Sequence, residues 1–255
     1  MNSRPEESPA SLPTQPKSVP ISLPAIAPQV TYSILGLTVF VYLLQLLSQF
    51  LVGYDLPVAI GAKANDYIRM GEVWRFFTPM LLHGSVLHIG FNMYALYIFG
   101  IGLERRYGHG RFLGLYILSG FAGSVFSFLF SSAYSIGASG AIFGLVSAEG
   151  VFLYHNRKLF GNQARRAIGN VIFVVVFNLV LGLQPGIDNW GHVGGLVGGL
   201  IFAWFAGPRW ELEGIFPSLH LVDRREGREI ILGGVVVAII FGALAVFGIL
   251  SPIVQ

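Results

Sequence analysis

The chain has 255 residues, of which 54% are hydrophobic and only 11% are charged, and its mean hydropathy is +0.67. This composition excludes an ordinary soluble domain and indicates a polytopic membrane protein. The sequence contains no cysteine, which excludes disulfides, a thiolate nucleophile and a Cys-ligated metal. The net charge of +3 comes from basic residues between apolar spans, so we expect a lipid bilayer and no nucleic acid as partner.

The segments of the chain follow from its hydropathy. Residues 1–28 are rich in Pro and Ser and predict a disordered cytoplasmic tail, not a signal peptide. A helix needs about 20 apolar residues to cross the hydrocarbon core, with about 17 as the lower end. Spans near or above this length are predicted at 30–53, 85–103, 112–134, 139–154, 167–183, 190–206 and 230–250. The charged, amphipathic connection at 208–229 is expected to lie at the cytoplasmic interface.

Lysine and arginine set the predicted orientation. Most of the 16 basic residues lie in the tail and in the connections after the second, fourth and sixth spans. The other side of the membrane has only Lys63, Arg69 and Arg75, which all lie between the first two spans. Because cytoplasmic loops carry the excess of Lys and Arg, the N-terminus is predicted in the cytoplasm and the C-terminus outside.

The predicted orientation places four polar residues at similar depth near the outer face of the membrane. In this orientation the second, fourth and sixth spans run inward from the outer face. His88 and Asn92 lie at the start of the second span, Ser139 at the start of the fourth and His192 at the start of the sixth. An intramembrane histidine is a functional-site hypothesis by default. A serine hydroxyl needs a base to take its proton, so Ser139 is the candidate nucleophile and His192 its general base.

Glycines surround both residues. The two runs are Gly137-Ala138-Ser139-Gly140 and Gly191-His192-Val193-Gly194-Gly195. Small residues four apart let membrane helices approach almost to backbone contact, as a nucleophile and its base on different helices require. Glycine repeats alone usually indicate packing, and a lone serine can bond a carbonyl one turn back. Their joint occurrence at matched depth favours catalysis.

His88 and Asn92 are four residues apart and share one helical face. Both can donate hydrogen bonds to the oxyanion of an acyl-transfer intermediate, and the Ser139 backbone N–H near a helix N-terminus would be a third donor. The alternative is a polar pair that holds two helices together. Asp188 could complete a triad with His192, but its place at the beginning of the span favours a Ser–His dyad.

Other intramembrane chemistries fit the sequence poorly. It has no His-Glu-x-x-His motif, and His83 and His88 lack a third metal ligand. An aspartyl mechanism needs two carboxylates in one site, whereas Glu104 and Glu149 both lie near predicted cytoplasmic ends of spans. We therefore expect neither a metal nor a cofactor.

Several motifs occur together along the apolar part of the chain: Trp74-Arg75-Phe76 through His83, His88-Ile89-Gly90-Phe91-Asn92, Gly102-Leu103-Glu104-Arg105, and the Ser139 and His192 runs. In this combination the chain resembles the rhomboid family of intramembrane serine proteases. The resemblance implies an all-α polytopic membrane protein with a six-helix catalytic core over 29–207, in which water reaches a site below the outer surface. The segment 230–255 resembles the additional transmembrane helix of a six-plus-one subset.

The resemblance also implies roles for single residues. Ser139 would be the nucleophile and His192 the general base, without an aspartate, and His88, Asn92 and the Ser139 amide would be the oxyanion donors. Phe143 would pack against the His192 ring. The supporting residues would be the glycines Gly137, Gly140 and Gly195, the interfacial loop anchors Trp74 and Arg75, and the structural His83.

The predicted activity is hydrolysis of peptide bonds in or near transmembrane helices of single-span membrane proteins by a serine endopeptidase. Substrates would reach the site from lipid beside the fifth span, with Gln184-Pro185-Gly186 as a movable cap. A bacterial plasma membrane is the expected location, and the oligomeric state is not predicted. The alternatives are a catalytically silent rhomboid-like protein that binds membrane clients and, less favoured, a small-solute transporter.

Overall fold

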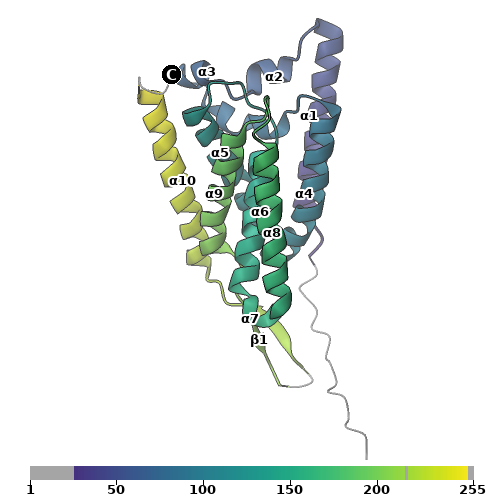
Figure 1. Cartoon of the computed structure of the whole chain (residues 1–255), viewed down its shortest axis with the longest axis vertical. Helices are drawn as coiled ribbons and strands as arrows, with labels where there is room; N and C mark the ends of the chain where they lie inside the picture. The colour runs from purple at the N-terminus through teal and green to yellow at the C-terminus, as the bar shows by residue number, and fades with distance from the viewer. Residues whose placement is uncertain (1–25, 216–217, 252–255) are drawn as a thin grey trace, which may run out of the picture.

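The computed structural model describes residues 26–215 and 218–251. Nearly all of the tail predicted at 1–28, and residues 252–255 of the predicted last segment, therefore lie outside the described residues. The described chain is a bundle of long helices (Figure 1). Their bounds are α1 Gln29–Val52, α4 Val86–Tyr107, α5 His109–Phe130, α6 Ser139–His155, α8 Asn162–Leu181, α9 Asn189–Ala206 and α10 Gly227–Leu250.

Five helices among the described residues are long and apolar enough to cross a membrane: α1, α4, α5, α8 and α10. α6 has only 17 residues, and α9 begins with polar Asn189 and His192 and is rich in glycine. The short α6 and the glycine-rich α9 are the helices that carry the predicted nucleophile and base. The chain is thus a mostly helical, polytopic integral membrane protein.

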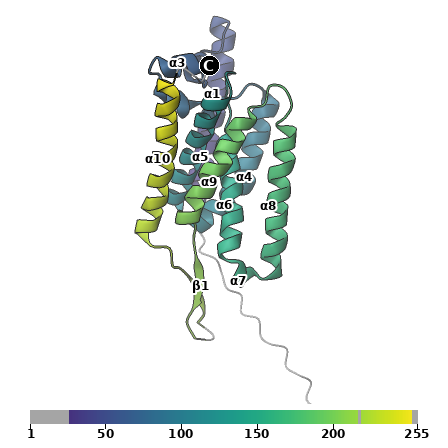
Figure 2. The same cartoon turned by 60° about the vertical axis from the view of Figure 1, so that its left-hand side comes forward.

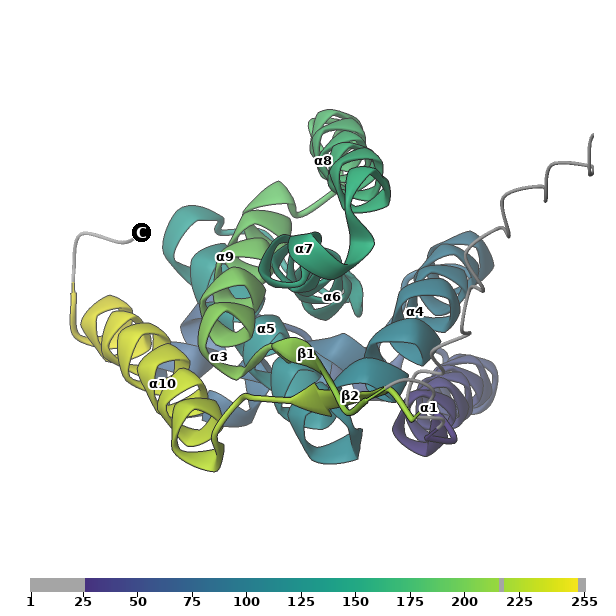
Figure 3. The same ribbon diagram turned by 90° about the horizontal axis from the view of Figure 1, so that it is seen from below.

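α5 lies at the centre of the bundle and α8 at its edge (Figures 2 and 3). Inside the described structure 56% of the apolar window of α5 is buried, against 6% of that of α8. Lipid tails are as apolar as the helices, so van der Waals packing between closely approaching backbones has to stabilise the centre. Glycine provides that approach, because a Cβ at Gly123 of α5 would stand 2.7 Å from the carbonyl oxygen of Gly191 in α9.

The third predicted span needs a correction at its end. The sequence predicts 112–134, whereas α5 ends at Phe130 and Ser131 caps it by donating its N–H to the Ser127 carbonyl. Residues 131–138 run on as a connection to Ser139, and their backbone pairs with the first loop between Lys63 and Ser135. This pairing satisfies backbone groups that a longer helix would have satisfied itself.

The loop between α1 and α4 folds into short elements: α2 Leu56–Gly61, α3 Asn65–Arg69, η1 Val73–Phe76 and η2 Thr78–Leu81. Arg75 holds them together, since its guanidinium donates to the carbonyls of Ala62 (2.8 Å) and Ala59 (2.9 Å) and pairs with Glu72 at 2.6 Å. Its side chain is 3% exposed. Arg75 therefore anchors the loop through the loop's own carbonyls, and its expected depth at the membrane interface stays a prediction.

The expectation of an all-α fold also needs a correction. The connection at 208–229 contains two antiparallel strands, β1 Trp210–Glu213 and β2 His220–Asp223, at the end of the molecule opposite α2 and α3 (Figure 1). The Trp210 ring stands edge-on to Phe152 of α6, and the Trp210 backbone N–H donates to Asn156 Oδ1 at 2.7 Å. Packing against α6 thus favours an extended β1, where the charge pattern predicts only an amphipathic segment.

Candidate active site

Ser139 and His192 face one another across two helices. Ser139 is the first residue of α6 and His192 lies in the first turn of α9. Ser139 Oγ lies 2.9 Å from His192 Nε2, which is hydrogen-bond distance. With its proton on Nδ1, the imidazole accepts the hydroxyl hydrogen at Nε2, as a base acting on a serine must.

The His192 ring is held by an aromatic side chain. Phe143, one turn after Ser139 on α6, stacks on it with ring centroids 4.4 Å apart and an angle of 13° between the planes. Phe143 is itself buried. The ring therefore has a fixed plane, and α6 supplies both the hydroxyl that the ring contacts and the surface against which it lies.

Asp188 makes no hydrogen bond to the His192 imidazole among the described residues. Its Oδ1 accepts the Gly191 N–H at 3.0 Å and thereby caps α9. Within the described residues, His192 Nδ1 and Asp188 Oδ2 are both buried without a hydrogen-bond partner. Within the described residues, Ser139 and His192 are therefore hydrogen-bonded to one another, and the side-chain hydrogen bond of Asp188 goes to the start of α9 and not to the ring.

His88 and Asn92 of α4 lie beside the turn that leads to Ser139. A Cβ added at Gly137 would stand 2.7 Å from His88 Nε2 and 3.8 Å from Asn92 Nδ2. Gly137 has a φ of +126°, which L side chains rarely adopt, so both space and backbone require glycine there. Asn92 Nδ2 donates to the His88 carbonyl at 3.1 Å. The Ser139 N–H belongs to the first turn of α6, where N–H groups have no intrahelical acceptor.

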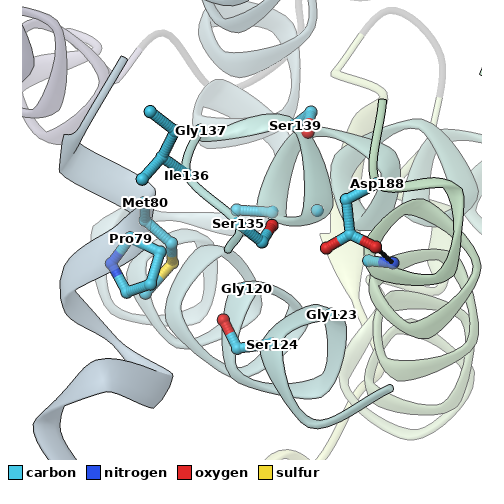
Figure 4. Close-up of a pocket in the computed structure, with 13 residues that line it drawn as sticks. Pro79, Met80, Gly120, Gly123, Ser124, Ser135, Ile136, Gly137, Ser139 and Asp188 are labelled. Carbon is cyan, nitrogen blue, oxygen red and sulfur yellow. Dashed lines mark hydrogen bonds between the residues drawn. The ribbon is translucent and has the colours of Figure 1, made fainter. Parts of the chain in front are cut away.

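Two cavities meet at Ser139. One has a volume of about 530 Å³ and is bounded by His88, His192, the connection before α6 and the loop before α9. The other, of about 20 Å³, is lined by Ser124, Ser135 and Asp188 as well as Ser139 (Figure 4). A single water molecule fits in such a volume, which polar groups line. The hydroxyl is therefore accessible from a space that can hold both a polypeptide segment and water.

The predicted first-loop residues Trp74, Arg75 and His83 do not line the two cavities at Ser139. The Trp74 indole is half-exposed and donates to the Ile60 carbonyl at 3.0 Å. His83 is buried, and its ring lies edge-on to the His88 ring at 5.0 Å. Burial, with His88 nearby, lowers the pKa of the His83 imidazole to about 4, so this ring is neutral at physiological pH. In the described parts of the chain, no cluster of His, Cys, Asp or Glu could hold a metal ion.

Comparison with known proteins fits this geometry. The family model described as Rhomboid domain matches residues 70–209, a stretch that contains both Ser139 and His192. The chain belongs to the rhomboid family. The resemblance predicted from the motifs is thereby confirmed.

Relatives of this rhomboid chain occur in bacteria and plants. It is 42% identical over 178 residues to Rhomboid protease GluP of Bacillus subtilis, which covers 69% of this chain and 34% of that protein. It is 31% identical over 204 residues to Rhomboid protease AarA of Providencia stuartii, and this match covers 71% of this chain and 73% of AarA. It is 42% identical over 134 residues to RHOMBOID-like protein 1 of Arabidopsis thaliana, and this match covers 52% of this chain and 34% of the plant protein. The chain thus matches about a third of the length of GluP and of the plant protein.

Sequence reasoning missed three polar residues around this rhomboid site, of which Gln45 and Lys63 are buried and Asn65 is half-buried. Gln45 of α1 exchanges hydrogen bonds with the His83 backbone, at 3.0 Å in each direction, and donates to Asp55 at 2.7 Å. Lys63 and Asn65 bind the connection that precedes α6. Gln45 could have been found, because a polar side chain inside an apolar span needs a partner. Lys63 lies in a connection, where a lysine is read as a topology signal.

Proposed function

We propose that this rhomboid-family protein is an intramembrane serine endopeptidase that cleaves membrane proteins with a Ser139–His192 dyad. The observation that carries the proposal is the 2.9 Å contact between Ser139 Oγ and His192 Nε2 at a cavity of about 530 Å³. His88 and Asn92, with the Ser139 N–H, are the proposed oxyanion donors, since all three lie at the turn that presents Ser139. Losing one such donor typically costs about 10²–10³ in rate.

The reaction follows from these positions. His192 Nε2 takes the Ser139 hydroxyl proton as Oγ bonds to the scissile carbonyl carbon, and the carbonyl oxygen becomes the oxyanion. His192 then gives its proton to the leaving amine, the C–N bond breaks, and an ester to Ser139 remains. Water attacks the ester while His192 accepts a water proton. His192 returns that proton to Ser139 as the acid leaves. No step requires a metal or cofactor.

The proposed substrates are single-span membrane proteins that unwind locally at the site. Carbonyls within a helix are already hydrogen-bonded and shielded, so an intact helix cannot present its peptide bond to Ser139. The proposed path from lipid passes beside α8, whose side chains are the least buried of the long helices. Gly186, Ile187 and Asp188 line the cavity, which suits the connection at 184–186 to the role of a movable cap.

We also propose a six-plus-one arrangement in a bacterial plasma membrane, with the N-terminus cytoplasmic and the site opening outward. α6 and α9 would complete a six-helix core with α1, α4, α5 and α8, and α10 would be the additional helix. The catalytic core would extend over 29–207, and the segment 230–255 would comprise the seventh transmembrane helix and the C-terminus. Because the chain has no cysteine, single cysteines at Tyr134 and at His220 can be tested with an impermeant maleimide. We expect labelling from outside at Tyr134 only, and the reverse pattern would refute the orientation.

A catalytic test compares the wild type with Ser139→Ala and His192→Ala in liposomes that contain a single-span substrate. Ser33→Ala and His220→Ala, which change exposed residues, are the matched controls. We expect both site variants to lose cleavage and fluorophosphonate labelling, and both controls to keep them. Equal cleavage by all variants would refute the dyad. A wild type that binds clients but cleaves none would favour the silent client-binding alternative.

A further inference from the structure

Lys63 is a fully buried lysine in the loop between α2 and α3. Its side chain is 0% exposed. The ammonium donates three hydrogen bonds, to the carbonyl oxygens of Ser131 (2.8 Å) and Ala133 (2.8 Å) and to Asn65 Oδ1 (3.0 Å). All three acceptors are uncharged. Burial lowers the pKa of the Lys63 ammonium to about 8, with Asp188 acting in the opposite direction, so the group still has three N–H donors at pH 7.

The ammonium lies at the end of the central helix. α5 ends at Phe130, and the negative end of its dipole favours a cation just beyond its last turn. Asn65 completes this arrangement, because its Nδ2 donates to the carbonyls of Phe128 (3.2 Å) and Ser131 (3.1 Å). A buried charge without an acid in contact costs several kcal/mol unless hydrogen bonds satisfy it. The carbonyls after α5 provide those bonds.

The same lysine also binds the connection to α6 through its backbone. Its N–H donates to the Ser135 carbonyl at 2.9 Å, and its carbonyl accepts the Ser135 N–H at 3.1 Å. Side chain and backbone together therefore hold residues 131–135 over their length. Ser131, Ala133, Tyr134 and Ser135 line the cavity at Ser139, so this connection is one wall of the cavity.

The Ser139–His192 pair itself does not depend on that wall. α6 and α9 meet through glycines, and a Cβ added at Gly195 would overlap the Gly140 carbonyl. Because this contact lies outside residues 131–135, we expect it to hold the two helices at their short distance when those residues lose order. A substitution at Lys63 should therefore change how the cavity binds a substrate and leave the positions of the Ser139 hydroxyl and the His192 imidazole unchanged.

We propose that Lys63 is a positioning residue that fixes residues 131–135 as a wall of the Ser139 cavity and thereby determines how tightly a polypeptide substrate is held. The proposal rests on the proposed function for its effect on cleavage. Its structural part, the order of the wall, can be measured without any activity.

The test compares the wild type with Lys63→Met, which keeps the length of the side chain and removes its donors. Lys158→Met on the exposed surface of α7 Arg157–Phe160 is the matched control. We expect Lys63→Met to raise the KM for a single-span substrate at least about tenfold, the size expected when charge-assisted hydrogen bonds are lost. The kcat and the rate of labelling by a small fluorophosphonate should stay within about threefold of wild type, because they require only the dyad. Lys63→Gln, with two donors, should give an intermediate KM.

Hydrogen–deuterium exchange provides the readout that does not require activity. We expect exchange at residues 131–135 to rise at least about tenfold in Lys63→Met and to stay unchanged in the first half of α6. If Lys63→Met does not fold, Lys63→Gln and Asn65→Leu decide the question, with smaller changes in the same direction. Unchanged exchange, an unchanged KM, or parallel losses of labelling and cleavage would overturn the role of Lys63. A wild type that neither labels nor cleaves would instead overturn the proposed protease, while the exchange result would still decide whether Lys63 orders the wall.

Discussion

Gly195 of α9 packs on Gly140 of α6 so closely that a methyl group at Gly195 would overlap the Gly140 carbonyl group. This contact sets the separation of the two helices that carry His192 and Ser139. Gly195→Ala must push α6 and α9 apart, and a displacement of about 1 Å at a catalytic pair can cost about 10²-fold in rate. We therefore expect cleavage to fall at least about tenfold and the unfolding temperature to fall as well, since overpacking typically costs about 1–3 kcal/mol.

The matched control for this prediction is Gly242→Ala on α10. Nothing lies within 4 Å of a Cβ at Gly242, so the added methyl group meets open space. Cleavage and unfolding temperature should stay at or slightly above wild-type values. Wild-type activity in Gly195→Ala would show that the helices tolerate a larger separation than the geometry indicates.

Phe143 and His192 form the second contact that fixes the base. Phe143→Leu removes the stacked ring and keeps an apolar side chain of similar size, so the imidazole loses its fixed plane. Aromatic pairs contribute about 0.5–1.5 kcal/mol beyond their buried area, which predicts a fall in kcat of about two- to tenfold with little change in KM. Phe143→Tyr keeps the ring and should retain nearly all activity. Steady-state cleavage in liposomes measures kcat and KM for each variant. Equal losses of activity in Phe143→Leu and Phe143→Tyr would contradict a stacking role.

The pairing of Ser139 with His192 was predictable from the sequence because both residues begin apolar spans at similar predicted depth and both lie among glycines. Ser139 and His192 lie where the apolar spans and glycine repeats predict them, whereas the contact of Phe143 with the His192 ring was expected only from the family resemblance. The long helices were predictable from hydropathy, apart from their ends. Ends depend on caps, and the Ser131 cap that stops α5 cannot be distinguished by hydropathy from a further turn.

Buried cations were not predictable in this way. Arg75 and Lys63 lie in a connection between spans, where basic residues normally mark one side of the membrane. Arg75 instead binds carbonyls of the first loop and Lys63 binds carbonyls of the connection before α6, and which carbonyls need donors follows only from the folded backbone. The hairpin of β1 and β2 was missed for a similar reason, because its strands are four residues long and are stabilised by contact with α6.

Arg75 gives a prediction about stability. Its planar guanidinium reaches two carbonyls and Glu72 and stacks on the Tyr67 ring. The single ammonium of lysine cannot reproduce these guanidinium contacts. Arg75→Lys therefore leaves buried acceptors without a donor, and each such acceptor lowers the free energy of unfolding by about 1–3 kcal/mol. We expect a clear fall in the unfolding temperature in detergent, measured by circular dichroism. Arg228→Lys, at a side chain that is 82% exposed, should leave it unchanged, and equal effects of the two changes would contradict the structural role of Arg75.

His83 gives a prediction about pH. Burial lowers the pKa of its imidazole from 6.5 in the unfolded chain to about 4 in the folded protein. Between these values the unfolded state binds the extra proton, so His83 contributes stability in full above pH 6.5 and loses it as the pH falls toward 4. The loss is about 3 kcal/mol for a shift of this size.

The measurement is the unfolding temperature of wild type and His83→Phe at several values of pH from 7 to 4. The phenylalanine keeps an aromatic ring against His88 and cannot titrate, so we expect a flatter acid dependence in the variant. The difference between the two proteins should grow as the pH falls below 6.5. Parallel curves over this range would show that His83 is not the group whose protonation destabilises the fold.

Asp188 distinguishes a dyad from a triad. In a Ser–His–Asp triad, replacing the aspartate by asparagine leaves the geometry intact but lowers kcat by about 10⁴, because the wrong imidazole tautomer results. Here Asp188 accepts the Gly191 N–H and makes no hydrogen bond to the His192 ring. Asparagine caps helices as well as aspartate, so Asp188→Asn should keep kcat within about threefold of wild type, whereas Asp188→Ala should destabilise the protein by about 1 kcal/mol. A loss of several orders of magnitude in Asp188→Asn, with an unchanged unfolding temperature, would mean that Asp188 orients His192 during the reaction after all.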